Sequence, residues 1–244
     1  MDRNKSLNSL EKQSPCVLIV GGGINGVGTF RDLALNGVDV LLIDRCDYGS
    51  GASSASSRMA HGGIRYLENG EFRLVREAVQ ERNRMLQNFP TLVQPLPTTI
   101  PIFRIFSGLL NAPLKFPHLL EKPSERGALV IKIGLILYDA YSGRAVVQRV
   151  TPRHVFENRR CSMENFPHLN PRVRYTATYF DGLILSPERL VLEMMLAAEK
   201  EGGHARALNY VSLMGFERTS IVIRDEFLQK GLGSSEFPVA EPEY

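Results

Sequence analysis

The stretch Cys16-Val-Leu-Ile-Val-Gly-Gly-Gly-Ile-Asn-Gly26 joins a short apolar run directly to a cluster of glycines. A continuous apolar run bounded by glycine is typical of a strand that is buried on both faces of a parallel sheet. Helical spacing follows over residues 29–36, and Gly37 provides a C-terminal stop. A second apolar run, over residues 38–43, ends at Asp44. Strand, glycine turn, helix and strand in this order predict one βαβ unit and an α/β fold.

The glycines of this turn are spaced as Gly-x-Gly-x-x-Gly, at positions Gly21, Gly23 and Gly26. The first permits the tight turn, the second lets the backbone approach a pyrophosphate, and the third allows the helix to pack closely on the strand. Asp44 lies eighteen residues after Gly26, where an acidic side chain can accept hydrogen bonds from a ribose diol. The pattern predicts a dinucleotide site for NAD or FAD and disfavours NADP, whose 2′-phosphate Asp44 would repel. A glycine turn without a ligand is the alternative.

Beyond this unit the sequence predicts helices and strands around a proline-rich stretch. Apolar spacings of three, four and seven predict a helix over residues 71–89, and Arg82 interrupts its stripe. Seven prolines between residues 90 and 123 exclude a regular helix there and favour extended segments and loops. The other expected elements are a buried helix over 128–141, a strand over 174–180, a helix over 186–200 that begins at a Ser-Pro-Glu cap, and a strand pair over 208–215 and 219–224.

Composition places the chain among ordinary globular proteins. Its 244 residues are 43% hydrophobic and 23% charged, and the net charge of +3 is too small to indicate nucleic acid as a partner. Cys16, Cys46 and Cys161 form no Cys-x-x-Cys pair, so we expect neither a disulfide framework nor a metal site, and a reducing compartment is favoured. The N-terminus lacks the apolar core of a secretory signal, and the most apolar stretch is far shorter than the ~20 residues that span a bilayer. We therefore expect a cytoplasmic protein.

A second informative segment runs Gly51-Ala-Ser-Ser-Ala-Ser-Ser-Arg-Met-Ala-His-Gly-Gly-Ile-Arg-Tyr-Leu67. Its clustered hydroxyls can hydrogen-bond a pyrophosphate or a ribityl chain, and its glycine pair lets a planar ring lie against the backbone. The guanidinium of Arg65 presents a fork of donors that suits a phosphate monoester. Structural roles are also open, because the serines can cap a helix, Arg65 can form a salt bridge and Tyr66 can belong to the core.

This segment and the stretch Glu71-Phe-Arg-Leu-Val-Arg-Glu-Ala78 closely resemble FAD-dependent, quinone-linked glycerol-3-phosphate dehydrogenases. The glycine turn at 21–26 and the stretches Lys132–Asp139 and Asp181–Leu190 are also typical of that family, and the resemblance extends over residues 16–210. It implies an α/β fold with a Rossmann-like FAD-binding domain of the D-amino-acid-oxidase-like type, together with part of a substrate or cap region.

The resemblance implies site residues by position. Arg65 and Tyr66 match positions that line the substrate pocket, where the family holds the substrate phosphate. His61 is a candidate catalytic base, although a histidine beside glycines is at least as often structural. The residues that match the family's contacts with FAD are Gly21, Gly23, Gly26, Asp44, Ser53, Ser54, Ser57, His61, Gly62 and Gly63. Asp44 stands where a glutamate is common in such flavoproteins, but its shorter side chain can make the same bonds.

The reaction that the resemblance implies is oxidation of sn-glycerol 3-phosphate to dihydroxyacetone phosphate. Hydride passes from C2 to flavin N5, and the electrons then pass to membrane quinone. The alternatives are a catalytically inactive flavoprotein fragment and another FAD-dependent oxidoreductase of the same superfamily. Because members of the family are much longer, we expect this chain to represent the N-terminal part of such an enzyme.

The expected organisation has five parts. They are a polar arm over 1–14, the FAD-binding βαβ unit and flavin-contacting segment over 15–90, an insertion or cap region on the substrate side over 91–180, a return to the FAD-binding domain over 181–226, and a loose tail over 227–244. Residues 101–160 carry ten Lys or Arg against four Asp or Glu. This excess indicates either a solvated basic face or peripheral docking on an anionic membrane, at the cytoplasmic face of the inner membrane. The quinone-linked chemistry of the family favours docking.

Overall fold

The computed structural model describes residues 15–106, 127–142, 150–217, 220–227 and 230–235. The chain divides into two compact units. The first unit contains the residues up to Ser57 and those from Ser186 onward, and the second is Arg58–Leu185. The expected N-terminal arm, the last nine residues of the expected tail, and residues 107–126 and 143–149 of the basic region lie outside the described residues.

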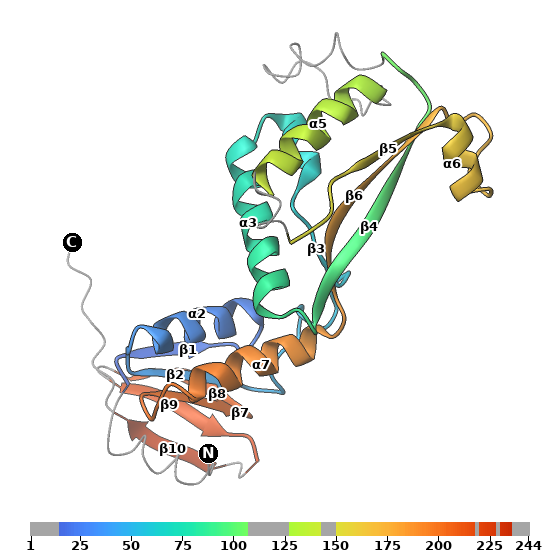
Figure 1. Ribbon diagram of the computed structural model, residues 1–244. Coiled ribbons are helices and arrows are strands. Elements are labelled where there is room, and N and C mark those ends of the chain that lie inside the picture. The colour runs from blue at the N-terminus through green and yellow to red at the C-terminus, as the bar shows by residue number, and fades with distance from the viewer. Residues whose placement is uncertain (1–14, 107–126, 143–149, 218–219, 228–229, 236–244) are drawn as a thin grey trace. The chain divides into compact units, whose positions relative to one another are not determined.

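A parallel sheet forms the centre of the first unit, in the order β1 (Val17–Val20), β2 (Val40–Asp44) and β7 (Ala205–Asn209). Helices α2 (Ile24–Leu35) and α7 (Pro187–Glu199) lie side by side over one face of this sheet (Figure 1). The order strand, glycine turn, helix and strand confirms the predicted βαβ unit and the α/β fold.

Strand β2 is buried on both faces, which explains why its sequence is continuously apolar. Val40 and Leu42 pack against the two helices, whereas Leu41 and Ile43 pack against a second sheet on the opposite face. All four side chains are fully buried. Asp44 therefore lies at the carboxyl end of a strand that is held in place by packing on both faces.

The second sheet of this unit is antiparallel, in the order β8 (Val211–Glu217), β9 (Ser220–Asp225) and β10 (Lys230–Ser235). The β8–β9 pair confirms the strand pair expected from the sequence, although the first strand begins later than predicted. Residues 230–235, which were expected to lie in a loose tail, instead pair with β9. Their glycine-rich composition suggested a loose tail. The pairing with β9 depends on a neighbouring strand, which the composition of residues 230–235 does not reveal.

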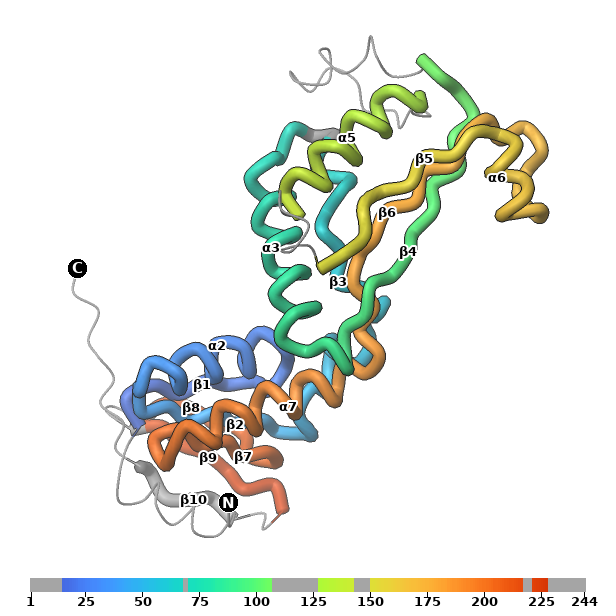
Figure 2. The backbone as a smooth tube through the Cα atoms, viewed as in Figure 1, coloured from blue at the N-terminus to red at the C-terminus, as the bar shows by residue number. Residues whose placement is uncertain are grey.

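The second unit contains an antiparallel sheet with β6 (Tyr175–Ile184) at its centre. Strand β4 (Val93–Ile102) pairs along one side of β6, whereas β3 (Met59–Ala60) and β5 (Val155–Asn158) pair along the other side. The tube in Figure 2 shows β6 running between β4 and β5 over much of its length. A short helix, α6 (Arg159–Asn165), follows β5.

Helices α3 (Phe72–Asn88) and α5 (Ala128–Tyr141) cover one face of this sheet, as Figure 1 shows. Helix α3 confirms the helix predicted from apolar spacing. Helix α5 confirms a helix over 128–141, but the expectation that it is buried is wrong for one side of it, where Leu129, Ile133, Ile136 and Leu137 are exposed. Val75 and Val79 of α3 and Leu135 of α5 belong to one buried cluster with residues of the sheet. Residues 58–90 therefore pack in the second unit, although the sequence grouped them with the glycine turn. No helix in the described ranges combines the length and apolar character needed to cross a membrane.

Strand β4 contains three prolines, Pro95, Pro97 and Pro101, in a stretch expected to form extended segments and loops. Proline has no N–H to donate, so a strand tolerates it at a sheet edge. Within the described residues β4 pairs only with β6. All three prolines lie at odd-numbered positions, so their backbone nitrogens point to the same side of the strand. That side faces away from β6, and no hydrogen-bond donor is needed there. The expectation of extended structure is confirmed, and the strand is longer and more regular than predicted.

Candidate functional site

The glycine turn after β1 folds back closely on itself. Gly21 has a φ of +110°, a conformation that L side chains rarely adopt, and its N–H donates to the Ile43 carbonyl at 2.8 Å. A Cβ on Gly26 would lie 1.9 Å from the Gly21 carbonyl oxygen. Helix α2 can therefore pack this closely on the turn only with glycine at position 26. These contacts agree with the mechanical roles predicted for the first and third glycines.

Asp44, at the carboxyl end of β2, is fastened to the same turn. One carboxylate oxygen accepts the Gly22 N–H at 2.6 Å, and the other accepts the Cys46 N–H at 2.8 Å. A carboxylate has about four acceptor positions, so Asp44 retains capacity for the hydroxyls of a ribose diol. The structure thus brings Asp44 to the glycine turn, as the motif predicts.

Helix α2 begins at this turn with its N-terminal donors only partly used. Its N-cap is Gly23, which has no side chain to cap the helix, and its first turn contains no acidic residue. The hydroxyl oxygen of Ser53 accepts the Ile24 N–H at 3.0 Å, which places a predicted serine at the helix start. The Ser53 hydroxyl still has its own proton to donate. The helix end therefore combines N–H groups, a hydroxyl donor and the positive end of the helix dipole, a set that suits phosphate.

The other two predicted serines make no such contact with the helix start. The Ser54 hydroxyl donates to the carbonyls of Ser50 and Gly51, at 3.1 and 2.9 Å. Ser57 is exposed. Their predicted contacts with a cofactor stay predictions.

In the second unit, the His61-Gly62-Gly63 turn follows β3. His61 is exposed, whereas both glycines are buried. Gly63 has a φ of +72° and is the N-cap of a 3-10 helix, η1 (Ile64–Asn69). This helix carries Arg65, which is exposed, and Tyr66, whose ring lies 6.3 Å from that of His61. The turn therefore brings the candidate base close to one of the two residues predicted to line a substrate pocket.

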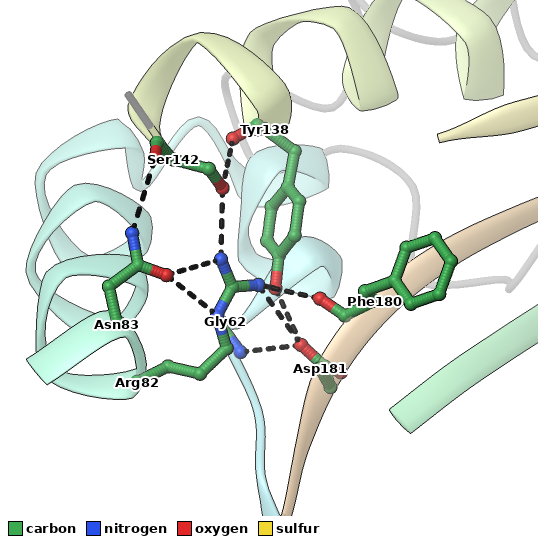
Figure 3. Close-up of polar contacts among 7 residues, drawn as sticks. All are labelled: Gly62, Arg82, Asn83, Tyr138, Ser142, Phe180 and Asp181. Carbon is green, nitrogen blue, oxygen red and sulfur yellow. Dashed lines mark hydrogen bonds and ion pairs between the residues drawn. The ribbon is translucent and has the colours of Figure 1, made fainter. Parts of the chain in front are cut away.

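A buried polar network holds the backbone of this turn (Figure 3). One carboxylate oxygen of Asp181 accepts the Gly62 N–H at 2.9 Å and the Tyr138 hydroxyl at 2.6 Å. The Arg82 guanidinium donates to the Tyr138 hydroxyl at 2.8 Å and lies 3.7 Å from the Asp181 carboxylate. The side chains of Arg82 and Asp181 are 1% and 2% exposed. This ion pair is therefore removed from water. Each charge must find its hydrogen-bond partners within the protein.

The Arg82 guanidinium uses all of its donors in this network. In addition to Tyr138, it donates to the Phe180 carbonyl at 2.7 Å and the Ser142 hydroxyl at 2.9 Å. The Asn83 side-chain oxygen accepts two further bonds, at 3.2 and 2.8 Å. An arginine has five N–H donors in a fixed plane. Their full use fixes the orientation of the guanidinium plane, and with it the position of the Tyr138 hydroxyl.

Two tyrosines of this region remain neutral far above physiological pH. Burial raises the pKa of the Tyr138 hydroxyl above its ordinary value, against the opposing effect of the Arg82 charge. Burial likewise raises the pKa of Tyr179 to about 12, against the opposing effect of the Arg65 charge. The two rings meet edge to face, with centroids 5.8 Å apart. Tyr138 therefore keeps the proton that it donates to Asp181.

Arg82, Tyr138 and Asp181 were not among the site residues that the sequence predicts. One signal of the network was visible, because a charged residue at position 82 interrupts the apolar stripe of α3. Its partners come from α5 and β6, far along the chain, and local spacing does not pair them. Resemblance to a family marked the stretches that contain Tyr138 and Asp181, but assigned them no role.

Comparison with known proteins gives a consistent result. The family described as FAD dependent oxidoreductase matches residues 16–224. A glycerol-3-phosphate dehydrogenase from Synechocystis is 41% identical over 207 residues, which are 83% of this chain and 32% of that protein. A D-erythritol 1-phosphate dehydrogenase from Brucella abortus is 37% identical over 134 residues, which are 55% of this chain and 23% of that protein. The chain thus spans about a third or less of the length of these curated relatives.

A solved structure shows the same fold. Glycerol-3-phosphate dehydrogenase from Bacillus halodurans, complexed with FAD, aligns with a TM-score of 0.60 at 19% identity. The alignment covers 94% of this chain and 34% of that chain.

The residues of the first unit fit the adenosine and pyrophosphate part of the family's cofactor. The N–H groups at the start of α2, the Ser53 hydroxyl and the acceptor Asp44 are the groups that two phosphates and a ribose require, and Gly26 lets the helix pack close enough to the turn to present them. From its matched residues, its fold and this glycine turn, the chain belongs to the family of FAD-dependent oxidoreductases.

Proposed function

We propose that this chain provides the FAD-binding residues of a flavin-dependent dehydrogenase that oxidises sn-glycerol 3-phosphate to dihydroxyacetone phosphate. The observation that carries the cofactor part of the proposal is the glycine turn, in which Gly26 closes on Gly21 and Asp44 holds the Gly22 N–H. The similarity to a glycerol-3-phosphate dehydrogenase over 83% of the chain supports the substrate.

Each group of residues has a definite task in this proposal. Asp44 accepts the ribose hydroxyls, and the N–H groups at the start of α2 bind the pyrophosphate. The backbone of Gly62 and Gly63 borders the flavin ring, since these positions match the family's contacts with the cofactor. FAD, when bound, supplies the acceptor for the hydride that leaves the substrate.

The substrate is held by residues of the turn and of η1. The exposed Arg65 guanidinium binds the phosphate monoester through charge-assisted hydrogen bonds, and Tyr66 lines the pocket beside it. His61 accepts the proton of the C2 hydroxyl, as a general base. The ring of Tyr66 lies beside the imidazole, with the two centroids 6.3 Å apart.

Reduction of bound flavin in the absence of oxygen tests this proposal. The purified chain, mixed with FAD and freed of excess cofactor, should be yellow and should bleach when glycerol 3-phosphate is added. Glycerol, which lacks the phosphate, should leave the spectrum unchanged. A yellow protein that neither glycerol 3-phosphate nor D-erythritol 1-phosphate bleaches would show an inactive flavin-binding fragment.

A second substrate is favoured by one specific observation, the 37% identity to a D-erythritol 1-phosphate dehydrogenase. Both substrates are polyols that carry a phosphate monoester, which a guanidinium recognises in the same way. The same spectroscopic experiment separates them. Bleaching by D-erythritol 1-phosphate and not by glycerol 3-phosphate would change the substrate and leave the phosphate site in place.

Arg65→Ala should weaken binding of the phosphorylated substrate by roughly ten- to a hundredfold, the loss expected for hydrogen bonds to a charged group. The affinity for FAD should stay unchanged. Arg73→Ala is the matched control, because Arg73 is a highly exposed arginine of α3 whose partner is Glu77. Substrate titrations of the flavin spectrum measure the first effect and flavin fluorescence the second. Equal loss of both affinities in Arg65→Ala would show a structural role.

The electron acceptor in this proposal is membrane quinone, and peripheral contact with the cytoplasmic face of the inner membrane brings the two together. The excess of Lys and Arg over residues 101–160 supports that contact, since each cation near an anionic surface adds about 1 kcal/mol. Sedimentation with anionic vesicles should show binding that falls as salt is raised. Binding that does not respond to salt would contradict electrostatic docking.

A further inference from the structure

The Gly62 backbone is held by side chains from three different elements of the second unit. Asp181 lies on β6 next to Gly182, which pairs with Ala60 at the end of β3. The bond from the Gly62 N–H to the Asp181 carboxylate, at 2.9 Å, therefore continues that backbone pairing through a side chain, beyond the last residue of β3.

Gly62 also lies directly against the Tyr138 hydroxyl. A Cβ at position 62 would stand 2.0 Å from the Tyr138 oxygen and 2.8 Å from a methyl of Val79. The turn is thus fixed by attraction to Asp181 and by close contact with Tyr138 (Figure 3). The contacts with Tyr138 and Val79 leave the Gly62 backbone no room to move toward α5 and α3.

Arg82 fixes both of these side chains in turn. Its guanidinium donates to the Tyr138 hydroxyl, and it faces the Asp181 carboxylate at 3.7 Å. Replacing a buried ion pair by apolar side chains of similar volume is often neutral or stabilising, so stability alone does not account for the network. What five fully used donors and a shared carboxylate provide is a defined geometry.

That geometry passes along the chain to the proposed site. Gly63, which follows Gly62, caps η1 in a left-handed conformation, and η1 carries Arg65 and Tyr66. A shift of the Gly62 backbone would therefore move both the segment that borders the flavin ring and the helix that presents Arg65.

We propose that Asp181, Tyr138 and Arg82 are positioning residues, which set the place of the 62–66 segment for the flavin ring and the substrate phosphate. The inference rests on the proposed function and deepens it. None of the three touches substrate or cofactor in this proposal, because they act through the Gly62 backbone.

Tyr138→Phe is the sharpest test, because it removes only the hydroxyl that joins Arg82 to Asp181 and keeps the ring against Tyr179. The probes are FAD and ADP. ADP lacks the flavin part of FAD, so a change that affects only FAD binding acts on the site of the flavin. We expect the dissociation constant of the full chain for FAD to rise roughly tenfold, as for one hydrogen bond to a charged group, while that for ADP stays unchanged. The absorption band of the bound flavin should also shift.

Two further variants keep the test decisive. Asp181→Asn retains an acceptor for the Gly62 N–H but removes the charge that faces Arg82. It should also weaken the binding of FAD and leave the binding of ADP unchanged. Ser162→Ala is the matched control, since it removes a buried hydroxyl that bonds Thr176 in the same unit and has no link to Gly62. It should alter neither affinity.

The outcomes separate the inference from the proposed function. Unchanged FAD affinity in Tyr138→Phe, or equal loss for FAD and ADP, would overturn the positioning role while the wild-type chain still binds FAD. A wild-type chain that binds neither FAD nor ADP would overturn the proposed function itself, and the inference with it.

Discussion

At the scale of single residues, Gly26 determines how closely helix α2 approaches the glycine turn. Gly26→Ala places a methyl group 1.9 Å from the Gly21 carbonyl oxygen, a backbone atom that cannot move without opening the turn. We predict that this change abolishes measurable FAD binding and lowers the free energy of unfolding by about 1–3 kcal/mol, as for other overpacked sites. Flavin fluorescence and urea unfolding measure the two effects.

A matched control lies two residues along the same helix. A Cβ on Gly28 would meet only a methyl group of Met194, at an ordinary 3.9 Å. Gly28→Ala should therefore leave FAD affinity unchanged and raise stability slightly, because alanine loses less backbone entropy in a helix. Equal behaviour of the two variants would contradict the role given to Gly26.

The sequence predicted the glycine turn with Asp44, but it missed the buried network of Arg82, Tyr138 and Asp181 for a physical reason. The three glycines, Asp44 and their roles lie within one local βαβ unit, whose spacing is fixed by covalent geometry. The bond between Gly62 and Asp181 instead joins residues 119 positions apart. Only the folded sheet brings these two residues together, so spacing along the chain could not predict their contact. The one local sign of the network was Arg82, a charged residue within the apolar stripe of α3.

At the scale of elements, α7 depends on a cap that the sequence made plain. The Ser186 hydroxyl accepts the Arg189 N–H, and Pro187 occupies the first helical position. Ser186→Ala should lower the free energy of unfolding by about 1 kcal/mol, whereas Ser186→Asn, which can still cap, should recover most of that loss. Urea unfolding followed by circular dichroism measures both variants, and an alanine variant as stable as wild type would show that the cap contributes little.

The other end of α7 carries Glu199, whose pKa is shifted in a definite direction. Burial raises the pKa of Glu199, and the Ala207 N–H that it accepts at 3.2 Å acts in the opposite direction. A carboxyl whose pKa is higher in the folded state than in the unfolded state binds protons better when folded, so its contribution to stability falls as pH rises through that range.

Glu199→Gln should therefore raise the free energy of unfolding at pH 7, with a gain that shrinks as the pH is lowered toward the ordinary carboxyl range of about 4. Denaturant unfolding at several pH values measures this trend. Glu201→Gln, at an exposed position two residues beyond the end of α7, is the matched control. A gain for Glu199→Gln that is equal at every pH would mean that ionisation is not its cause.

Element boundaries show where local reasoning is sufficient and where it is not. The two predicted helices of the second unit agree closely with α3 and α5, because α3 carries an apolar stripe over several turns and α5 is a continuous apolar stretch too long for a typical strand. Helix α2 begins at Ile24 and not at Thr29, since Gly23 serves as its N-cap without a recognisable capping side chain. The length of β4 depends on its place at the edge of the sheet, which proline spacing alone does not reveal.

At the scale of the whole chain, two compact units each contain a distinct set of groups. The first unit contains the glycine turn, Asp44 and the start of α2, and the second contains the turn at 61–63 and the buried network. Family membership explains why both sets occur in one sequence. Division of the chain at Ser57 was not predicted, because it follows from the packing of α3 onto α5 and the antiparallel sheet.

The central claim, that the glycine turn of this chain holds the adenosine and pyrophosphate part of FAD, is tested most directly by a titration of the purified chain with FAD followed by flavin fluorescence. We predict saturable binding of one FAD per chain, displacement of FAD by ADP, and weaker binding of both in Asp44→Ala. Absence of binding, or binding that neither ADP nor Asp44→Ala affects, would contradict it.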